Sequence, residues 1–198
     1  MSFPPLLDHV VVAGPDLGEL VARFADATGV TAAPGGVHPG AGTANALVAL
    51  TVAGERRPHY VELIGPDPDG TVEPAIFGIA ELTGPRVVTY AVHPADLDAT
   101  VAAWRARGDD PGPVEAMSRR TPDGTLLSWR LTRARPGRPD VPFLIDWGTT
   151  PHPGTTVGPA LDLLGFGPPE AGGPGYVLRV RGTDGGPVAL GEGLAPRR

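Results

Sequence analysis

An internal repeat is the feature that most constrains the fold of this chain. Residues 16–24 return as residues 96–104, an offset of 80 positions, and each copy starts with Asp-Leu and places large apolar residues four and seven positions after that leucine. This spacing puts the apolar side chains on one face of a helix. One supersecondary unit cannot bury its apolar face alone, whereas two copies that pack together can. We therefore predict a chain built from two similar modules.

The first module, residues 5–70, is predicted to contain a strand, a helix and two or three further strands. Leu6–Ala13 is a valine-rich apolar run that ends at Gly-Pro, as is typical of a buried strand. Asp16–Thr28 starts with an aspartate at an N-cap position, has an apolar face at helical spacing and is followed by glycine. Two more strands are predicted over Thr43–Val52 and His59–Ile64.

The second module, residues 85–150, repeats this order after a linking helix that we predict over residues 71–84. Its predicted elements are a strand at Arg86–His93, a helix at Asp96–Arg107, and strands at Val114–Arg119, Leu126–Thr132 and Val141–Trp147. The remaining residues, 151–198, are predicted to form a C-terminal extension with a β-hairpin around Thr-Asp-Gly-Gly. The predicted fold class is therefore α+β, with two βαβββ modules.

The composition supports a folded protein and excludes several classes of function. Hydrophobic residues make up 41% of the 198 residues and charged residues 19%, so the 29 Gly and 25 Pro indicate turns rather than disorder. Without cysteine there are no disulfides, thiolate metal sites or cysteine nucleophile. A net charge of -6 argues against a nucleic-acid partner. The N-terminus has no basic start and no long apolar run, so we expect no signal peptide, no membrane span and a cytoplasmic location.

Two ionisable residues lie inside apolar strands. His9 lies within the first strand, and Glu62 shares a strand face with Tyr60 and Ile64, because side chains alternate along a strand. A carboxylate among apolar neighbours is costly unless it is paired or bound to a cation. His9 and Glu62 are therefore candidate ligands of a divalent metal ion, since imidazole and carboxylate bind several such ions. The alternative is a hydrogen bond between them without a metal.

A second candidate lies in the glycine-rich segment Gly35–Leu47. His38, Thr43 and Asn45 are the informative residues there, and Asn45 is the single asparagine of the chain. An inward asparagine donates and accepts hydrogen bonds with a ligand. The alternative is that the polar side chains satisfy backbone groups of the loop. The segment lacks a Gly-Lys-Ser/Thr ending and leads into a strand, so we predict no phosphate loop and no nucleotide cofactor.

A third candidate is the segment Pro142–Gly148. Aligning its final glycine with the glycine that ends the Glu62 strand places Asp146 on the opposite face of the sheet from Glu62. Trp147 then falls in the same phase as Glu62 and forms either a pocket wall or ordinary core. His152 follows a proline in a predicted loop, and we expect it to be exposed rather than catalytic.

A family resemblance rests on four segments: Leu7–Val11, Gly36–Leu47, Tyr60–Gly65 and Pro142–Gly148. They contain the motifs His-Pro-Gly-x-Gly-Thr-x-Asn and Tyr-x-Glu-Leu-Ile-Gly. Over about residues 5–153 the chain resembles the glyoxalase-like domain family of the vicinal oxygen chelate superfamily, which includes glyoxalase I, extradiol dioxygenases and bleomycin-resistance proteins. The resemblance implies paired βαβββ modules whose curved mixed sheet forms a cup-shaped cavity.

The resemblance also implies where a metal would bind. In the superfamily, the first and fourth strands of each module supply the ligands, which assigns His9 and Glu62 in the first module. The matching positions of the second module are Thr89 and Ile145, which leaves half of the metal site. His38 is a candidate replacement ligand, and His38 and Glu62 are the candidate catalytic residues.

Two classes of function follow from this resemblance. In the first, the chain is a metal-dependent lyase, isomerase or dioxygenase in which one divalent ion acts as a Lewis acid on a small substrate. In the second, the cup binds a drug or metabolite without chemistry. In either class the predicted substrate-binding residues are Asn45, Thr43, Tyr60 and Trp147. Both classes predict a small-molecule partner, and both are compatible with a homodimer.

Overall fold

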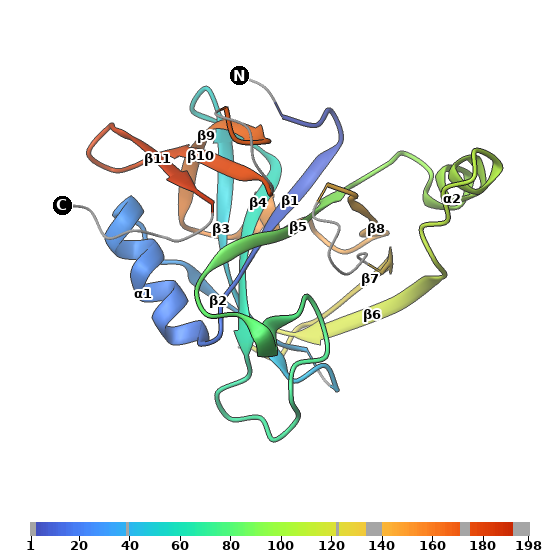
Figure 1. The fold of residues 1–198 in the computed structure, drawn as a ribbon, viewed down its shortest axis with the longest axis horizontal. Coiled ribbons are helices and arrows are strands. Elements are labelled where there is room, and N and C mark those ends of the chain that lie inside the picture. Colours follow the sequence, from blue (N-terminus) through green and yellow to red (C-terminus); the bar gives the residue numbers. More distant parts are fainter. Residues whose placement is uncertain (1–2, 39, 122, 134–139, 171–174, 192–198) are drawn as a thin grey trace.

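The computed structural model describes residues 3–38, 40–121, 123–133, 140–170 and 175–191 (Figure 1). The first module consists of β1 (Leu7–Ala13), α1 (Leu17–Thr28), β2 (Ala33–His38), β3 (Thr43–Val52) and β4 (Glu55–Pro66). The second consists of β5 (Arg86–Val92), α2 (Leu97–Ala106), β6 (Val114–Arg120), β7 (Leu126–Thr132) and β8 (Phe143–Asp146). The predicted α+β fold with two βαβββ modules is confirmed.

The two helices begin in the same way, as the sequence repeat predicts. The side chain of Asp16 accepts a hydrogen bond from the backbone nitrogen of Glu19 at 2.7 Å, and Asp96 accepts one from Ala99 at 2.9 Å. Each aspartate thus satisfies a backbone N–H group that has no partner within its helix. The repeated Asp-Leu sequence therefore marks the same N-terminal cap in both helices.

The sheet closes into a barrel. β4 pairs with β1 on one side and with β3 on the other, so eight strands form a ring in the order β3-β2-β6-β7-β8-β5-β1-β4. Closing the ring in this way leaves no free edge among these eight strands. Within the described residues, β2 and β6 meet through one residue pair, Val37 with Arg120, so this is a weak seam between the two modules.

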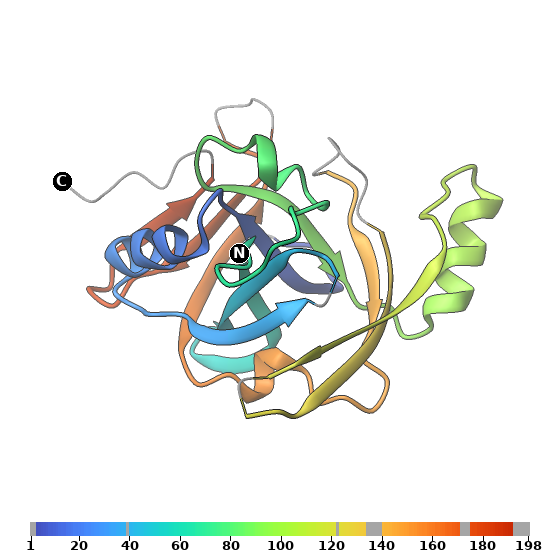
Figure 2. The ribbon, with the colours of Figure 1, turned by 90° about the horizontal axis from the view of Figure 1, so that it is seen from below.

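Alternate residues of β1 face two different cores. Val10 and Val12 pack outside the barrel in the cluster that contains Phe24 of α1, whereas Val11 and Ala13 belong to a cluster inside it. α1 and α2 lie at opposite ends of the molecule (Figure 2). From His9 onwards, the alternation of β1 therefore sends the odd-numbered side chains towards the barrel interior, whereas Leu7, before a register shift in the ladder, belongs to the outer cluster.

Two local predictions differ from the structure. Residues 71–84, predicted to be a linking helix, contain only one 3₁₀ turn, η1 (Ile79–Glu81), so that prediction is wrong. Phe77 and Gly78 both have positive φ angles, 57° and 63°, which interrupt a right-handed helix. β2 was hidden in the sequence because Gly35 and Gly36 lie inside it, and Gly36 has a φ of 143° beside a break in the ladder register.

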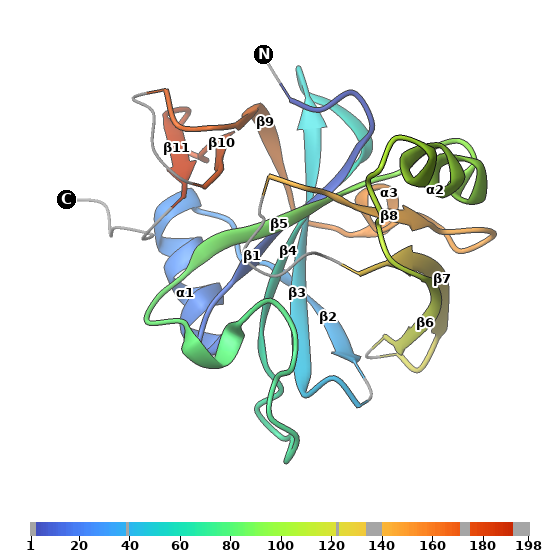
Figure 3. The same cartoon turned by 45° about the vertical axis from the view of Figure 1, so that its right-hand side comes forward.

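The C-terminal extension adds strands to the barrel. It contains α3 (Pro153–Thr156), β9 (Ala160–Gly167), β10 (Val177–Arg181) and β11 (Pro187–Leu190). β9 runs parallel to β3, and β10 and β11 form the predicted antiparallel hairpin (Figure 3). The extension therefore lengthens the sheet beside β3.

The turn between β10 and β11 is anchored to α1. The backbone nitrogen of Thr183 donates to the carbonyl of Thr28, at the end of α1, at 2.9 Å. The C-terminal hairpin is therefore held against the first module. Among the described residues, no helix has both the length and the apolar character needed to cross a membrane.

Candidate active site

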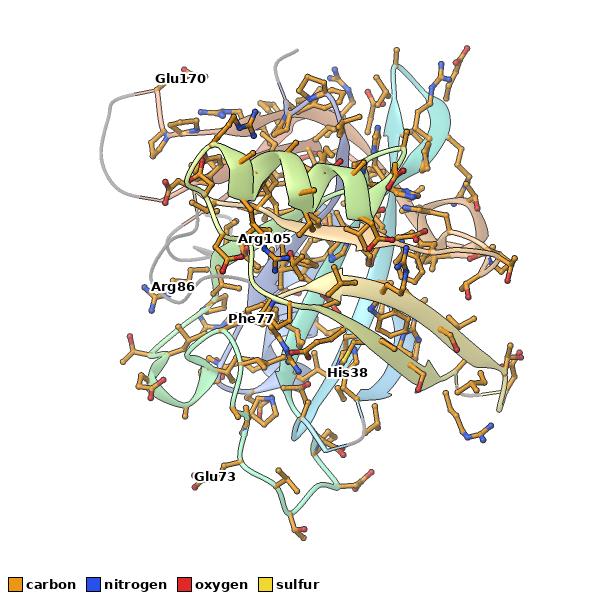
Figure 4. All side chains as sticks on the ribbon, turned by 90° about the vertical axis from the view of Figure 1, so that its right-hand side faces the viewer. His38, Glu73, Phe77, Arg86, Arg105 and Glu170 are labelled. Carbon is orange, nitrogen blue, oxygen red and sulfur yellow. The ribbon has the colours of Figure 1, made fainter. Side chains whose placement is uncertain are left out.

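A cavity of about 380 Å³ lies inside the barrel. Its polar lining residues are His9, His38, Asn45, Tyr60, Glu62, Arg119, Thr132 and Arg133. The second module contributes mainly apolar walls: Met117, Trp129, Leu131, Phe143, Ile145 and Trp147. The linker also reaches the cavity through residues 75–77, and Figure 4 labels Phe77 together with His38. A concave apolar pocket with a few convergent polar groups is the usual form of a small-molecule site.

Glu62 lies between two strands that each offer it a polar partner. Its Oε2 is 3.7 Å from Nε2 of His9 on β1, and its Oε1 accepts a hydrogen bond of 2.5 Å from the side-chain amide of Asn45 on β3. The carboxylate is buried, with 8% of the residue exposed. The alternation of the strands therefore brings the predicted pair His9 and Glu62 together and adds Asn45.

His38 approaches the same carboxylate from β2. Its Nε2 lies 3.9 Å from Oε1 of Glu62 and 3.4 Å from the amide nitrogen of Asn45, while its Nδ1 contacts Oγ1 of Thr43 at 3.0 Å. Thr43 is itself buried, so it positions His38 rather than lining the cavity. Burial lowers the pKa of His38, and this outweighs the raising effect of Glu62, so the imidazole is neutral near pH 7.

A second carboxylate, Asp8, holds His9 from behind. Oδ1 of Asp8 is 2.6 Å from Nδ1 of His9, and Oδ2 accepts hydrogen bonds from Trp147 Nε1 at 3.0 Å and from His152 Nε2 at 2.9 Å. Burial raises the pKa of Asp8, but the hydrogen bonds from His152 and His9 outweigh it and hold the pKa well below its usual range. Since Asp8 fixes Nδ1, the other ring nitrogen of His9 faces Glu62.

Aromatic rings surround this pair. Tyr60 stacks on His9 with ring centres 4.4 Å apart, and Phe143 meets the same imidazole edge-on at 5.4 Å. Burial raises the pKa of Tyr60 well above its ordinary value, so its hydroxyl group stays protonated. Trp147 lines the cavity while its indole nitrogen is bonded to Asp8, so it is a pocket wall as well as a structural anchor.

The expectation that His152 is exposed was wrong. Its side chain is 11% exposed, and it caps α3 by accepting a hydrogen bond from the backbone nitrogen of Gly154 at 2.9 Å. Asp146 does face away from the cavity, as predicted, and pairs with Arg130 at 2.9 Å. Sequence reasoning missed Asp8, although an aspartate directly before a strand histidine was a signal for it.

Arg119 was also missed. It lies on β6, lines the cavity with 4% of its surface exposed, and donates a hydrogen bond from Nη1 to the carbonyl of Gly35 on β2. Burial lowers the pKa of Arg119, but a guanidinium group keeps its proton in proteins. The residue therefore brings a positive charge to the cavity. Nothing in its local sequence distinguished it from its exposed neighbour Arg120.

Comparison with known families agrees with this architecture. A family model described as a glyoxalase-like domain matches residues 7–165, which include both modules and the cavity. The chain belongs to the glyoxalase-like domain family. No curated protein is significantly similar to this glyoxalase-like protein in sequence.

Several solved structures are similar to this glyoxalase-like protein. A hypothetical protein from Staphylococcus aureus has 18% identity and a TM-score of 0.50, over 73% of this chain and 59% of the other, which shows a shared fold. This chain therefore spans less than two thirds of that protein. The methylmalonyl-CoA epimerase of Mycobacterium tuberculosis has 22% identity and a TM-score of 0.42, over 73% and 88% of the two chains. The Streptomyces coelicolor methylmalonyl-CoA epimerase, bound to 2-nitronate-propionyl-CoA, has 19% identity and a TM-score of 0.45, over 73% and 95%.

The family resemblance implies a divalent metal ion, and the cavity offers an incomplete set of ligands for one. His9 Nε2 and Glu62 Oε2 face each other, whereas Oε1 of Glu62 is occupied by the Asn45 amide. The second module places Ile145 on the cavity wall and leaves the hydroxyl group of Thr89 buried without a hydrogen-bond partner. Catalytic zinc sites use three protein ligands. His9 and Glu62 are two, and among the described residues the candidate replacement His38, although 3.9 Å from Glu62, does not complete a group of three with them. The chain's own side chains are therefore the groups available for chemistry in the cavity.

A second group of potential metal ligands in the glyoxalase-like protein consists of Asp8, His93 and His152. The backbone N–H group of Gly154 donates to Nδ1 of His152, so the ring proton lies on Nε2, which donates to Asp8. A metal would need the lone pair of that same Nε2. These contacts fit a hydrogen-bond network that orients Asp8 better than they fit a metal centre.

Proposed function

We propose that this glyoxalase-like protein is an enzyme that moves a proton on a small carbonyl compound held in the barrel cavity, with Glu62 as the group that takes and returns the proton. The observation that carries the proposal is the position of the Glu62 carboxylate inside the apolar cavity, 3.7 Å from His9 and hydrogen-bonded to Asn45. A general base must lie within hydrogen-bond reach of the proton that it removes, and a cavity that holds the substrate beside it provides that reach. Glu62 has this placement.

The proposed reaction needs no oxidant or reductant. Glu62 removes a proton from the carbon next to a carbonyl group, so the C–H bond breaks, an O–H bond forms on Glu62, and the electron pair moves onto the carbonyl oxygen as an enolate. Return of the proton by Glu62 to the same carbon regenerates the substrate, with deuterium incorporated in D₂O. In an α-hydroxy carbonyl compound, return of the proton to the former carbonyl carbon, with the hydroxyl proton moving to the enolate oxygen, gives an isomer. Protein donors that point at the developing negative charge lower the barrier of such a step.

The neighbouring residues have supporting roles in this proposal. Asn45 holds one carboxylate oxygen of Glu62, which leaves the other oxygen for the proton. His9, whose Nδ1 is held by the Asp8 carboxylate, keeps its Nε2 towards Glu62, where it is placed to accept a hydrogen bond from the carboxyl group once Glu62 has taken the proton. The neutral imidazole of His38, fixed by Thr43, is a second hydrogen-bonding group for a substrate oxygen.

The test is proton exchange in heavy water. The protein is incubated in D₂O with a panel of 2-oxo acids and α-hydroxy carbonyl compounds, and loss of the α-proton is followed by ¹H NMR. We expect exchange with the wild type and a loss of at least about 100-fold in Glu62→Gln, because general-base catalysis contributes about 10²–10⁴-fold. The matched control is Glu55→Gln on the same strand, since Glu55 is exposed and pairs with Arg57 outside the cavity.

The second candidate function is non-catalytic binding of a small molecule. The largely apolar second module and its missing ligand positions favour it. Non-catalytic binding is the conclusion if compounds of the panel bind in the cavity but none of them exchanges its α-proton faster with the protein than in buffer alone. A metal-dependent enzyme is distinguished by adding Mn²⁺, Fe²⁺, Zn²⁺ or Ni²⁺: one bound ion per chain, lost in both His9→Gln and Glu62→Gln, would show that protein groups alone are insufficient.

A further inference from the structure

Arg119 differs from the arginines that form ion pairs among the described residues. Those arginines lie within 4.0 Å of a carboxylate, and their side chains are 28% to 54% exposed: Arg23, Arg57, Arg105, Arg130, Arg133, Arg179 and Arg181. Arg119 is 4% exposed, and among the described residues no carboxylate oxygen lies within 4.0 Å of its guanidinium group. Its charge is buried without a direct ion pair.

Arg133 also lines the cavity, so its ion pairing can be compared directly with that of Arg119. Its guanidinium group pairs with Glu115 at 2.5 Å, and its side chain is 52% exposed. Arg133 therefore has a direct ion pair at the rim, whereas Arg119 has, among the described residues, only the longer-range attraction of Glu62. A buried charge costs free energy unless it is paired and hydrogen-bonded.

The guanidinium group of Arg119 has donors to spare. An arginine carries five N–H donors in a planar fork, and within the part of the chain that the structure describes one hydrogen bond leaves this side chain, to the Gly35 carbonyl. The remaining donors lie on a residue of the cavity lining. Such a fork matches the two oxygens of a carboxylate group.

The rest of the wall defines what the anion is attached to. Met117, Trp129, Leu131 and Phe143 form an apolar surface on the same strands or the next ones. Glu62 lies in the same cavity and repels a second negative charge. The cavity therefore suits a molecule with one anionic end and an apolar body.

We propose that the cavity takes a small carboxylate with an apolar body, whose carboxylate group is bound by the guanidinium group of Arg119. This inference rests on the proposed function in one respect, because it uses the same cavity. It adds the substrate class and the orientation: the carboxylate end lies at β6, and the carbon that loses its proton lies towards Glu62. Arg119 then also stabilises the negative charge that develops on the substrate when Glu62 removes the proton.

The competing explanation is structural. Arg119 bridges β6 to β2 through the Gly35 carbonyl, at the seam where the strands share one residue pair. In that case the guanidinium group holds the barrel together and is indifferent to ligand charge. The two explanations differ in whether the protein discriminates between a carboxylate and its neutral amide.

The experiment measures binding without turnover. Quenching of tryptophan fluorescence reports on the cavity, since Trp129 and Trp147 line it. The probes are matched pairs that differ in charge but little in size: phenylacetate with phenylacetamide, and isovalerate with isovaleramide. We expect the wild type to bind each carboxylate at least about 10-fold more tightly than its amide, since hydrogen bonds to charged groups are the stronger ones.

Two variants separate the explanations. Arg119→Gln is expected to lose the preference for carboxylate while it still binds the amides, and Arg120→Gln, on the same strand but exposed, is expected to keep it. Equal binding of acid and amide by the wild type, no binding of either pair at millimolar concentration, or an unchanged preference in Arg119→Gln overturns the proposal. If Arg119→Gln does not fold, Arg119→Lys decides: it must keep a preference for the carboxylates.

The two proposals fail independently. Glu62→Gln is expected to keep the carboxylate preference, because it leaves Arg119 and the apolar walls in place. Loss of exchange with retained preference therefore supports both proposals. If the protein prefers carboxylates but catalyses no exchange, the proposed binding site is retained and the proposed enzymatic function is rejected. If it catalyses exchange on neutral ketones alone, the proposed function is retained and the carboxylate site is rejected.

Discussion

Oδ1 of Asp8 lies 2.6 Å from Nδ1 of His9, although the two residues are adjacent in the chain. Adjacent side chains of a strand normally point to opposite faces. Here the aspartate reaches its neighbour and is fixed on its other oxygen by Trp147 and His152. The second carboxylate thereby connects the cavity with the segment that follows β8.

Asp8→Asn is expected to lower both stability and activity. An asparagine carries no charge and has one acceptor oxygen for three donors, so we expect a loss of about 1.5–3 kcal/mol in the free energy of unfolding. Asp146→Asn is the control, because its partly exposed pair with Arg130 is worth less than about 1 kcal/mol. Urea unfolding measures the stability of the two variants, and the exchange assay measures the activity of Asp8→Asn. An Asp8→Asn protein as stable as the control would show that the network does not hold the site.

Asn45→Ala tests the support of Glu62. The variant loses the 2.5 Å hydrogen bond to the carboxylate but also removes the amide oxygen, which is buried without a partner. These effects oppose each other, so we expect a loss of only about 1 kcal/mol in stability. Exchange activity is expected to fall about 10- to 100-fold, since the carboxylate is no longer held in place. A large loss of stability with normal specific activity would make Asn45 structural.

Gly35→Ala tests the position of Asn45 by crowding its side chain instead of removing it. A Cβ atom at Gly35 would overlap the side-chain oxygen of Asn45, whereas one at Gly84 would have no heavy atom within 4 Å. We expect Gly35→Ala to lose about 1–3 kcal/mol and to displace Asn45, and Gly84→Ala to be tolerated. Thermal unfolding and the exchange assay measure the two effects. Equal behaviour of the two variants would contradict this packing.

His59 makes stability depend on pH. Burial lowers its pKa, against raising effects of a backbone hydrogen bond to Leu7 and of the Asp8 charge, while His152 lowers it further. The folded state therefore takes up the proton less readily than the unfolded state. The contribution of His59 is complete above its unfolded pKa of about 6.5 and is lost as the pH falls below that value. The unfolding midpoint should drop between pH 7 and 5, and less so in His59→Gln.

Part of the site was predictable from the sequence for a simple physical reason. Strand alternation depends only on neighbouring residues, and it placed His9, Asn45 and Glu62 on inward faces that meet in the barrel. The repeated helix start similarly announced two modules, because an aspartate cap is a local feature.

The remainder depended on contacts that no local pattern encodes. Asp8 acquires its role from Trp147 and His152, which are more than a hundred positions away in the chain. Arg119 is distinguished from Arg120 only by the face of β6 that closes onto β2. The wrong prediction of a linker helix has the same cause. The apolar residues of the linker pack against the barrel, and that packing does not require a helix.

The two halves of the barrel make different contributions. His9, His38, Asn45 and Glu62 all belong to the first module, while the second supplies most of the apolar wall and Arg119. Substitutions on β6 to β8 at positions other than Arg119 are therefore expected to change which molecules fit the cavity without altering His9, His38, Asn45 or Glu62. The range of ligands and the proposed proton chemistry are then separable by mutation.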